Sequence, residues 1–130
     1  MIFLLCVLLG GCGMNKDEIA KVYANLAVFH QALNKPDYAV IIQSSDVEYK
    51  KSSQQDDLIA PFRTVHEKYG KVLVSEAIGY DVHNYLGANK ITLHQKTTFE
   101  KGVMEEILTY MFRDHEPHLL KYEVRPIAVP

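Results

Sequence analysis

Three polar side chains in the second half of the chain, Tyr80, Thr97 and Glu106, have the spacing that points most directly to chemistry. They fall on three successive predicted β-strands. Polar and apolar residues alternate in the first two, whereas the third, over 103–112, is apolar on both faces and is oriented by the turn before it. Short turns between these strands would place the three side chains side by side on one face of a sheet. A carboxyl group enclosed there can have a raised pKa and act as a general acid or base. The alternative is structural, with Glu106 hydrogen-bonded to Tyr80 or Thr97.

A second group of polar residues surrounds Pro117, where His115 and His118 lie close to Asp114 and Glu116 in a predicted turn. Imidazole and carboxylate groups ligate zinc and copper, so these two histidines are candidate metal ligands. Turns collect polar residues in any case, and no third firm ligand accompanies the pair. We therefore expect no metal and no cofactor.

Three helices are predicted in the first half of the chain. Apolar residues recur at helical spacing over 19–33, and Pro36 follows the end of this helix. A shorter helix is predicted over 38–44, residues 46–51 are ambiguous, and a third helix is predicted over 58–69.

Four strands are predicted in the second half, because the hydrophobic period changes to two after the third helix. Two-residue turns at Ala88-Asn89 and Lys101-Gly102 would make these strands an antiparallel meander. This register pairs Tyr80 with Thr97 and places Glu106 on the inner face. The inner residues expected on the first and last strands are Val72, Val74, Ile78, Tyr80, Val82, Leu120, Tyr122 and Val124.

Aromatic residues are expected between the first helix and the sheet: Tyr23, Phe29, Tyr80, Tyr110 and Tyr122. As core residues they need no further explanation. If the helix stands off the sheet, the same residues line a mostly apolar pocket with a few hydroxyl groups, as small-ligand sites often do.

The chain begins with an apolar run from Met1 to Leu9, followed by Gly10, Gly11 and Cys12. The run is too short to span a bilayer as a helix and has the length of a secretory signal. With the small residues and the cysteine, it resembles the signal and lipobox of a bacterial lipoprotein.

The lipoprotein resemblance implies a signal peptide over 1–11, lipidation of Cys12 and a short lipidated tether over 12–17. It also implies a location in the bacterial cell envelope, anchored in the outer membrane and facing the periplasm. No Lys or Arg precedes Lys16, whereas secretory signals carry basic residues ahead of the apolar run. A cytosolic protein that starts at Met14 therefore stays open as an alternative.

The order of the elements, three helices and then a four-stranded meander, carries a second resemblance. Together with Phe29-His-Gln-Ala-Leu-Asn-Lys-Pro-Asp-Tyr38 and the Lys-Tyr-Gly-Lys segment at 68–71, it resembles the nuclear-transport-factor-2-like, or cystatin-like, superfamily. The resemblance implies that residues 18–130 form one α+β domain. In this fold three N-terminal helices pack on a curved, cone-shaped sheet of four antiparallel strands. The superfamily contains enzymes and binding modules, so the fold does not give the function.

We expect a membrane-anchored, non-enzymatic binding or interaction module. It would contact the membrane through its lipid anchor and would form a homodimer or bind a partner protein through the outer face of the sheet. The formal net charge of −2 gives no basic field for nucleic acid. The alternative is a small-molecule-binding protein, or an enzyme of isomerase or dehydratase type, that uses the interior of the cone.

Overall fold

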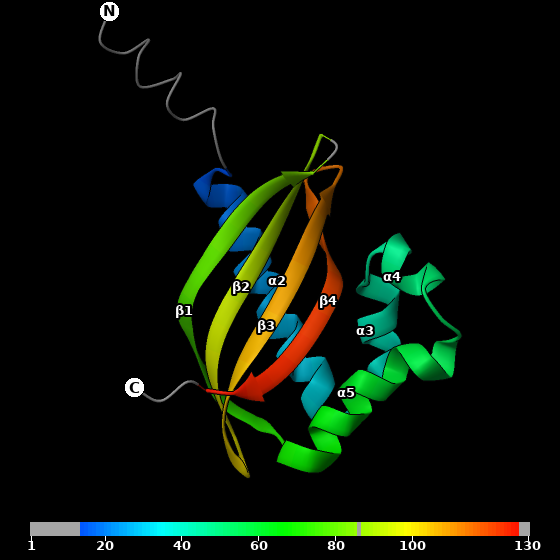
Figure 1. Cartoon of the computed structure of the whole chain (residues 1–130), viewed down its shortest axis with the longest axis vertical. Coiled ribbons are helices and arrows are strands. Elements are labelled where there is room, and N and C mark those ends of the chain that lie inside the picture. Colours follow the sequence, from blue (N-terminus) through cyan, green and yellow to red (C-terminus); the bar gives the residue numbers. More distant parts are fainter. Residues whose placement is uncertain (1–13, 86, 128–130) are drawn as a thin grey trace, which may run out of the picture.

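Helices occupy the first half of the chain and strands the second half (Figure 1). The computed structural model describes residues 14–85 and 87–127, so the predicted signal peptide and Cys12 lie outside the described residues. The elements are α2 (Lys16–Asn34), α3 (Tyr38–Ser44), α4 (Val47–Lys51), α5 (Gln55–Tyr69), β1 (Val72–Tyr85), β2 (Ala88–Phe99), β3 (Gly102–Arg113) and β4 (Glu116–Pro126).

The strands form one open antiparallel sheet in the order β1-β2-β3-β4. Helix α2 crosses one face of this sheet, and α3, α4 and α5 lie on the β4 side (Figure 1). The predicted α+β class, with N-terminal helices and a four-stranded antiparallel sheet, is confirmed. Residues 46–51, ambiguous in sequence, contain the short helix α4.

Helix α2 is fixed at both ends by side-chain hydrogen bonds. At its start, the Asn15 side chain accepts from the Glu18 amide at 2.8 Å, and Glu18 accepts from the Asn15 amide at 3.3 Å. This reciprocal pair satisfies amide groups that have no partner within the helix. At its end, the Asn34 side chain exchanges two hydrogen bonds with the backbone of Val72. The end of α2 is therefore tied to the first residue of β1.

Helix α5 begins three residues earlier than predicted. Because the Leu58 amide already donates to the Gln54 carbonyl, the helix starts at Gln55 rather than at Leu58. Pro61 therefore lies in the second turn of the helix. Gly70 ends the helix as predicted, with φ of 80°, a conformation that glycine adopts without a Cβ penalty.

The predicted inner face of β3 is confirmed although the register differs. The loop between β2 and β3 is Glu100-Lys101, so Phe99 pairs with Gly102 rather than with Met104. A shift of two residues keeps every side chain on its own face. The inner residues of the two central strands are Ile91, Leu93, Gln95, Thr97, Phe99, Met104, Glu106, Leu108, Tyr110 and Phe112.

The predicted register of β1 is wrong. β1 ends at Tyr85, which pairs with Ala88, and Gly87 between the two strands has φ of 81°. Tyr80 therefore pairs with Leu93 instead of Thr97. The register also shifts between Val72 and Val74 and between Ala77 and Gly79, so that Leu73 and Ile78 are extra residues of β1 without a partner position on β2. These shifts leave Val74 and Ile78, both expected on the inner face, 53% and 57% exposed.

A bulge also changes the inner face of β4. The register shifts between the pair Thr109–Lys121 and the pair Tyr110–Leu119. Leu119, which is 4% exposed, therefore takes the inner position that the alternating pattern assigned to Leu120. Tyr122 follows on the same face as predicted.

An ion pair fastens the corner between α3 and α4 to the end of the sheet. Arg113 contacts both carboxylate oxygens of Asp46, with Nε 2.6 Å from Oδ1 and Nη2 3.1 Å from Oδ2. Asp46 is buried, caps α4 by accepting from the Glu48 amide, and donates its own amide to the Leu119 carbonyl. Burial raises the pKa of Asp46, but its hydrogen bonds with Arg113 and Glu48 outweigh that effect and hold the pKa below the ordinary 3.8.

This pKa direction predicts a loss of stability in acid. A carboxyl whose pKa is lowered on folding stabilises the fold above its unfolded pKa, and the contribution disappears as the pH falls through the folded pKa. We expect Asp46→Asn to lower the free energy of unfolding by about 2 kcal/mol at pH 7. The difference from the wild type should narrow as the pH falls below 3.8. Chemical denaturation at pH 7 and pH 3 measures both values.

The exposed Asp56 provides the matched control, because Asp56→Asn makes the same change without breaking a buried ion pair. Its effect should be small at both pH values. A deficit for Asp46→Asn that stays constant from pH 7 to pH 3 would contradict the assignment.

Candidate functional site

The buried carboxylate of Glu106 is the centre of the polar residues between α2 and the sheet. Glu106 has no exposed surface. Its Oε1 accepts from Thr97 Oγ1 at 2.5 Å and lies 2.7 Å from His30 Nε2, and its Oε2 accepts from Tyr122 at 2.6 Å. The contacts come from β2, α2 and β4. Both carboxylate oxygens are therefore satisfied by the protein.

A chain of donors extends this cluster to the edge strand β1. Because Thr97 donates its proton to Glu106, Ser75 must donate across the 2.9 Å contact between the Ser75 and Thr97 hydroxyl oxygens. Ser75 in turn accepts from Gln95 Nε2 at 3.1 Å. The chain of hydrogen bonds thus runs in one direction, from Gln95 through two hydroxyl groups to the carboxylate.

Two buried tyrosines surround the carboxylate. Burial raises the pKa of Tyr122, and the charge of Glu106 and the hydrogen bond between them add to this effect. Burial, with the charge of Glu106, also raises the pKa of Tyr110. Both phenols are therefore protonated at neutral pH. The Tyr110 hydroxyl and Gln95 Oε1 have no hydrogen-bond partner among the described residues.

The structure brings together two of the three residues proposed for chemistry. Thr97 and Glu106 are in contact, but Tyr80 lies farther along β1, opposite Leu93, and is 45% exposed. Ser75 is paired with Thr97 in its place. The sequence analysis missed His30 as the partner of Glu106. A signal was present, since His30 follows Phe29 on the apolar side of a helix predicted to cover the sheet.

The aromatic residues expected to line a pocket mostly form core. Phe29 is 4% exposed and packs against Tyr122, with ring centroids 4.8 Å apart. Phe62 of α5, which was not among the aromatic residues expected there, stacks on Tyr122 with ring centroids 5.6 Å apart. Tyr23 is half-buried at the edge of the core. These contacts fill the space beside the carboxylate with rings.

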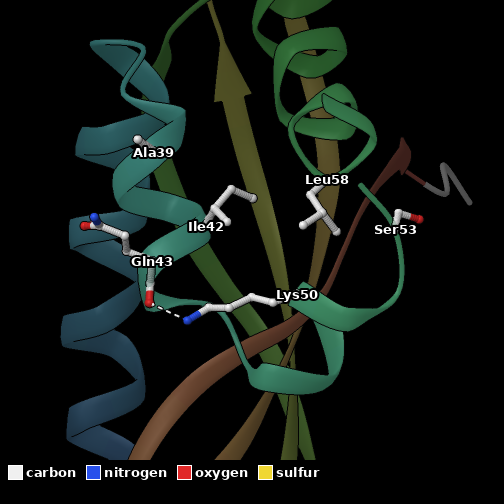
Figure 2. A pocket seen from close by; sticks show the side chains of 6 residues that line it. All are labelled: Ala39, Ile42, Gln43, Lys50, Ser53 and Leu58. Atoms are coloured by element: carbon white, nitrogen blue, oxygen red, sulfur yellow. Dashed lines mark hydrogen bonds between the residues drawn. The ribbon is translucent and has the colours of Figure 1, made fainter. Parts of the chain in front are cut away.

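A separate hollow of about 450 Å³ lies between α3, α4 and the start of α5 (Figure 2). Ile42 and Leu58 face each other across it, and the stem of Lys50 crosses below them. The Lys50 ammonium group donates to the Gln43 carbonyl at 3.0 Å. The full lining is Ala39, Ile42, Gln43, Lys50, Ser53 and Leu58. The hollow combines apolar walls with one cationic group at the rim.

Polar contacts hold the helices around the hollow to one another and to the sheet. Asp46 caps α4 and binds Arg113, and the Tyr49 hydroxyl donates to the Leu58 carbonyl at 2.7 Å. This last bond joins α4 to the first turn of α5. The walls of the hollow are therefore fixed to one another and to the sheet.

The candidate metal ligands do not converge. His115 lies in the exposed two-residue loop between β3 and β4, and His118 lies on β4 opposite Met111. Across residues 14–85 and 87–127, no group of three or more His, Cys, Asp or Glu side chains is placed to hold a metal ion.

Comparisons with protein-family models, with curated proteins and with solved structures find no match to this chain. Among the helices of the described residues, none has the length and apolar character needed to cross a membrane.

The hydrogen bond from Tyr122 to Glu106 predicts that loss of one hydroxyl group lowers the stability of the fold strongly. Tyr122→Phe removes a hydroxyl group that donates to a buried carboxylate, so we expect the free energy of unfolding to fall by about 1.5–3 kcal/mol. Tyr80→Phe makes the same change on a half-exposed ring and should cost less than about 0.5 kcal/mol. Urea denaturation of both variants measures the difference. Equal effects would show that the Tyr122 hydroxyl does not support Glu106.

Proposed function

We propose that this chain is a lipid-anchored, non-enzymatic binding module of the bacterial cell envelope. We further propose that the hollow between α3, α4 and α5 binds a small apolar molecule that carries an anionic group. The observation that carries the proposal is the contrast between two sites. The Glu106 carboxylate is fully buried and satisfied, whereas the hollow is open and its polar groups reach its rim.

The lining of the hollow supports this class of ligand. Its volume of about 450 Å³ is within the range of small-molecule sites, which combine apolar walls with few polar groups. Ile42 and Leu58 offer apolar contact, and Lys50 offers a positive charge beside them. An anionic group on the ligand would pair with the Lys50 ammonium group.

The anchoring and the family belong to the same proposal. The apolar run that ends at Gly10, Gly11 and Cys12 supports a lipoprotein whose signal peptide is removed before Cys12. The helices followed by a meander support a nuclear-transport-factor-2-like domain, in which the cone would correspond to the space between α2 and the sheet. In this protein, the space between α2 and the sheet is filled mainly by core side chains.

A second candidate function is acid–base chemistry on a small molecule at His30 and Glu106. It is favoured by the short contact between these two groups and by the buried Tyr110 hydroxyl that lacks a partner among the described residues. His30 has 12% of its side chain exposed, which gives the pair an edge toward solvent. This chemistry requires that a substrate displace a donor of Glu106, so we place it second.

A fluorescent probe tests the hollow. Anilinonaphthalene sulfonate, an aromatic anion, should bind the folded full chain, and Ala39→Trp should weaken binding at least about tenfold by filling the site. Lys50→Gln should weaken binding up to about fivefold, because it removes one exposed ion pair. A fluorescence titration gives the dissociation constants.

The control is Ala24→Trp, which adds the same ring to an exposed alanine of α2 outside the hollow. It should bind the probe like the wild type. Unfolding curves of each variant verify that the fold is intact. If Ala39→Trp and Ala24→Trp bind the probe equally well, the hollow is not the site.

A further inference from the structure

A groove of about 600 Å³ lies on the face of the sheet opposite α2. Side chains from all four strands line it: His83, Asn84, Lys90, Thr92, Thr109, Leu120 and Lys121. The alternation of β2 and β3 explains its position, because Ile91 and Leu93 point to the core and Thr92 and Thr109 therefore point outward. The groove is thus separate from both the Glu106 cluster and the hollow between the helices.

The chemistry of the groove suits an anion that carries several oxygens. Its lining contains three basic side chains, those of His83, Lys90 and Lys121, and no carboxylate. The hydroxyl oxygens of Thr92 and Thr109 lie 3.2 Å apart, so one of the two protons remains for a ligand.

Two carboxylates near the groove already form ion pairs. Glu123 lies 2.7 Å from the Lys121 ammonium group, in a pair of which both members are exposed. Asp81 lies 3.3 Å from His94 Nε2. An exposed pair contributes about 0–1 kcal/mol, so Lys121 can exchange Glu123 for an external anion at little cost.

The groove lies toward the end of the molecule where α2 begins. Lys21, in the second turn of α2, donates to the His115 carbonyl at 3.1 Å and to the Glu116 carboxylate at 3.0 Å, in the loop between β3 and β4. Glu18 shares a surface hollow with Gly87, in the loop between β1 and β2. Figure 1 shows the start of α2 beside these two loops. His83 and Lys90 flank the β1–β2 loop on the outer face.

The length of the tether places this end close to a membrane if Cys12 is lipidated. Lys16, the first residue of α2, is four residues after Cys12. Even fully extended, four residues span at most about 14 Å. Attraction between basic side chains and an anionic surface acts over about 8–10 Å at ordinary ionic strength. The tether therefore limits how far this end of the molecule can lie from the lipid headgroups.

We propose that this groove binds the phosphate of an anionic phospholipid headgroup in the membrane to which the chain is anchored. The inference rests on the proposed lipidation of Cys12, which sets the orientation. The chain as a whole is acidic, with a formal net charge of −2, so its attraction to an anionic membrane must come from a local basic site. Binding would hold the domain in one orientation, with the β1–β2 and β3–β4 loops toward the membrane and the end of α5, beside the β2–β3 loop, away from it.

Vesicle binding of the full chain with Cys12→Ala tests the groove without any acyl chain. We compare its binding to vesicles of phosphatidylcholine alone with its binding to vesicles that also contain phosphatidylglycerol. The apolar N-terminal run acts on both kinds of vesicle, so the ratio of the two affinities measures the preference for anionic headgroups. Lys90→Gln with Lys121→Gln should lower this ratio by about fivefold for each lysine.

The matched control is Lys68→Gln with Lys101→Gln, which removes the same charge at the end of α5 and in the β2–β3 loop. This double variant should show the same ratio of the two vesicle affinities as the starting chain. A ratio near one for the starting chain, or an equal loss in both double variants, would overturn the proposal.

A separate measurement tests the anchor itself. Labelling of cells with a fatty-acid analogue should mark the wild-type chain and not Cys12→Ala. If the wild type is labelled but Cys12→Ala shows no preference for anionic vesicles, the lipid anchor stands and the proposed headgroup binding by the groove is refuted. A vesicle preference without any label refutes the anchor and the orientation that depends on it, while the anion chemistry of the groove stands.

Discussion

A buried carboxylate needs donors from the elements around it, and Glu106 on β3 takes them from α2, β2 and β4 through His30, Thr97 and Tyr122. Ser75 adds β1 through Thr97. Losing one partner would leave a charge or a donor unpaired in the core, which costs more than the same change at the surface. Apolar packing tolerates small shifts of a helix along a sheet, whereas these hydrogen bonds require one placement of α2. The cluster thus sets how the helix lies on the sheet.

This constraint affects where binding can occur. With the space between α2 and the sheet occupied by Glu106, its donors and the rings of Phe29 and Tyr122, the open surfaces lie elsewhere. One is the hollow between α3, α4 and α5, whose walls are fixed by the contact of Tyr49 with α5. The other is the basic groove on the outer face, close to the start of α2. Under the proposals above, the chain binds a ligand in the hollow while the groove rests on the membrane.

The sequence predicted the parts of this structure that depend on local patterns. The helical spacing in α2, the shorter helix predicted over 38–44 and the alternation in β2 all correspond to elements of the structure. Glu106 was placed on the correct face because a register error of two residues preserves the face. Tyr80 was placed opposite the wrong residue because β1 ends at Tyr85 and β2 begins at Ala88, two residues earlier than the predicted turn requires. The partner His30 depends on how α2 lies across the sheet, a long-range packing that residue spacing does not encode.

The coupling between His30 and Glu106 tests the central claim most directly. A double-mutant cycle with His30→Gln and Glu106→Gln, followed by denaturant unfolding at neutral pH, separates their interaction from the cost of each change alone. If the carboxylate holds α2 in place, the two effects should differ from additivity by about 1–3 kcal/mol. Effects that add within about 0.5 kcal/mol would contradict the account, because the contact between His30 and Glu106 would then not hold α2 on the sheet.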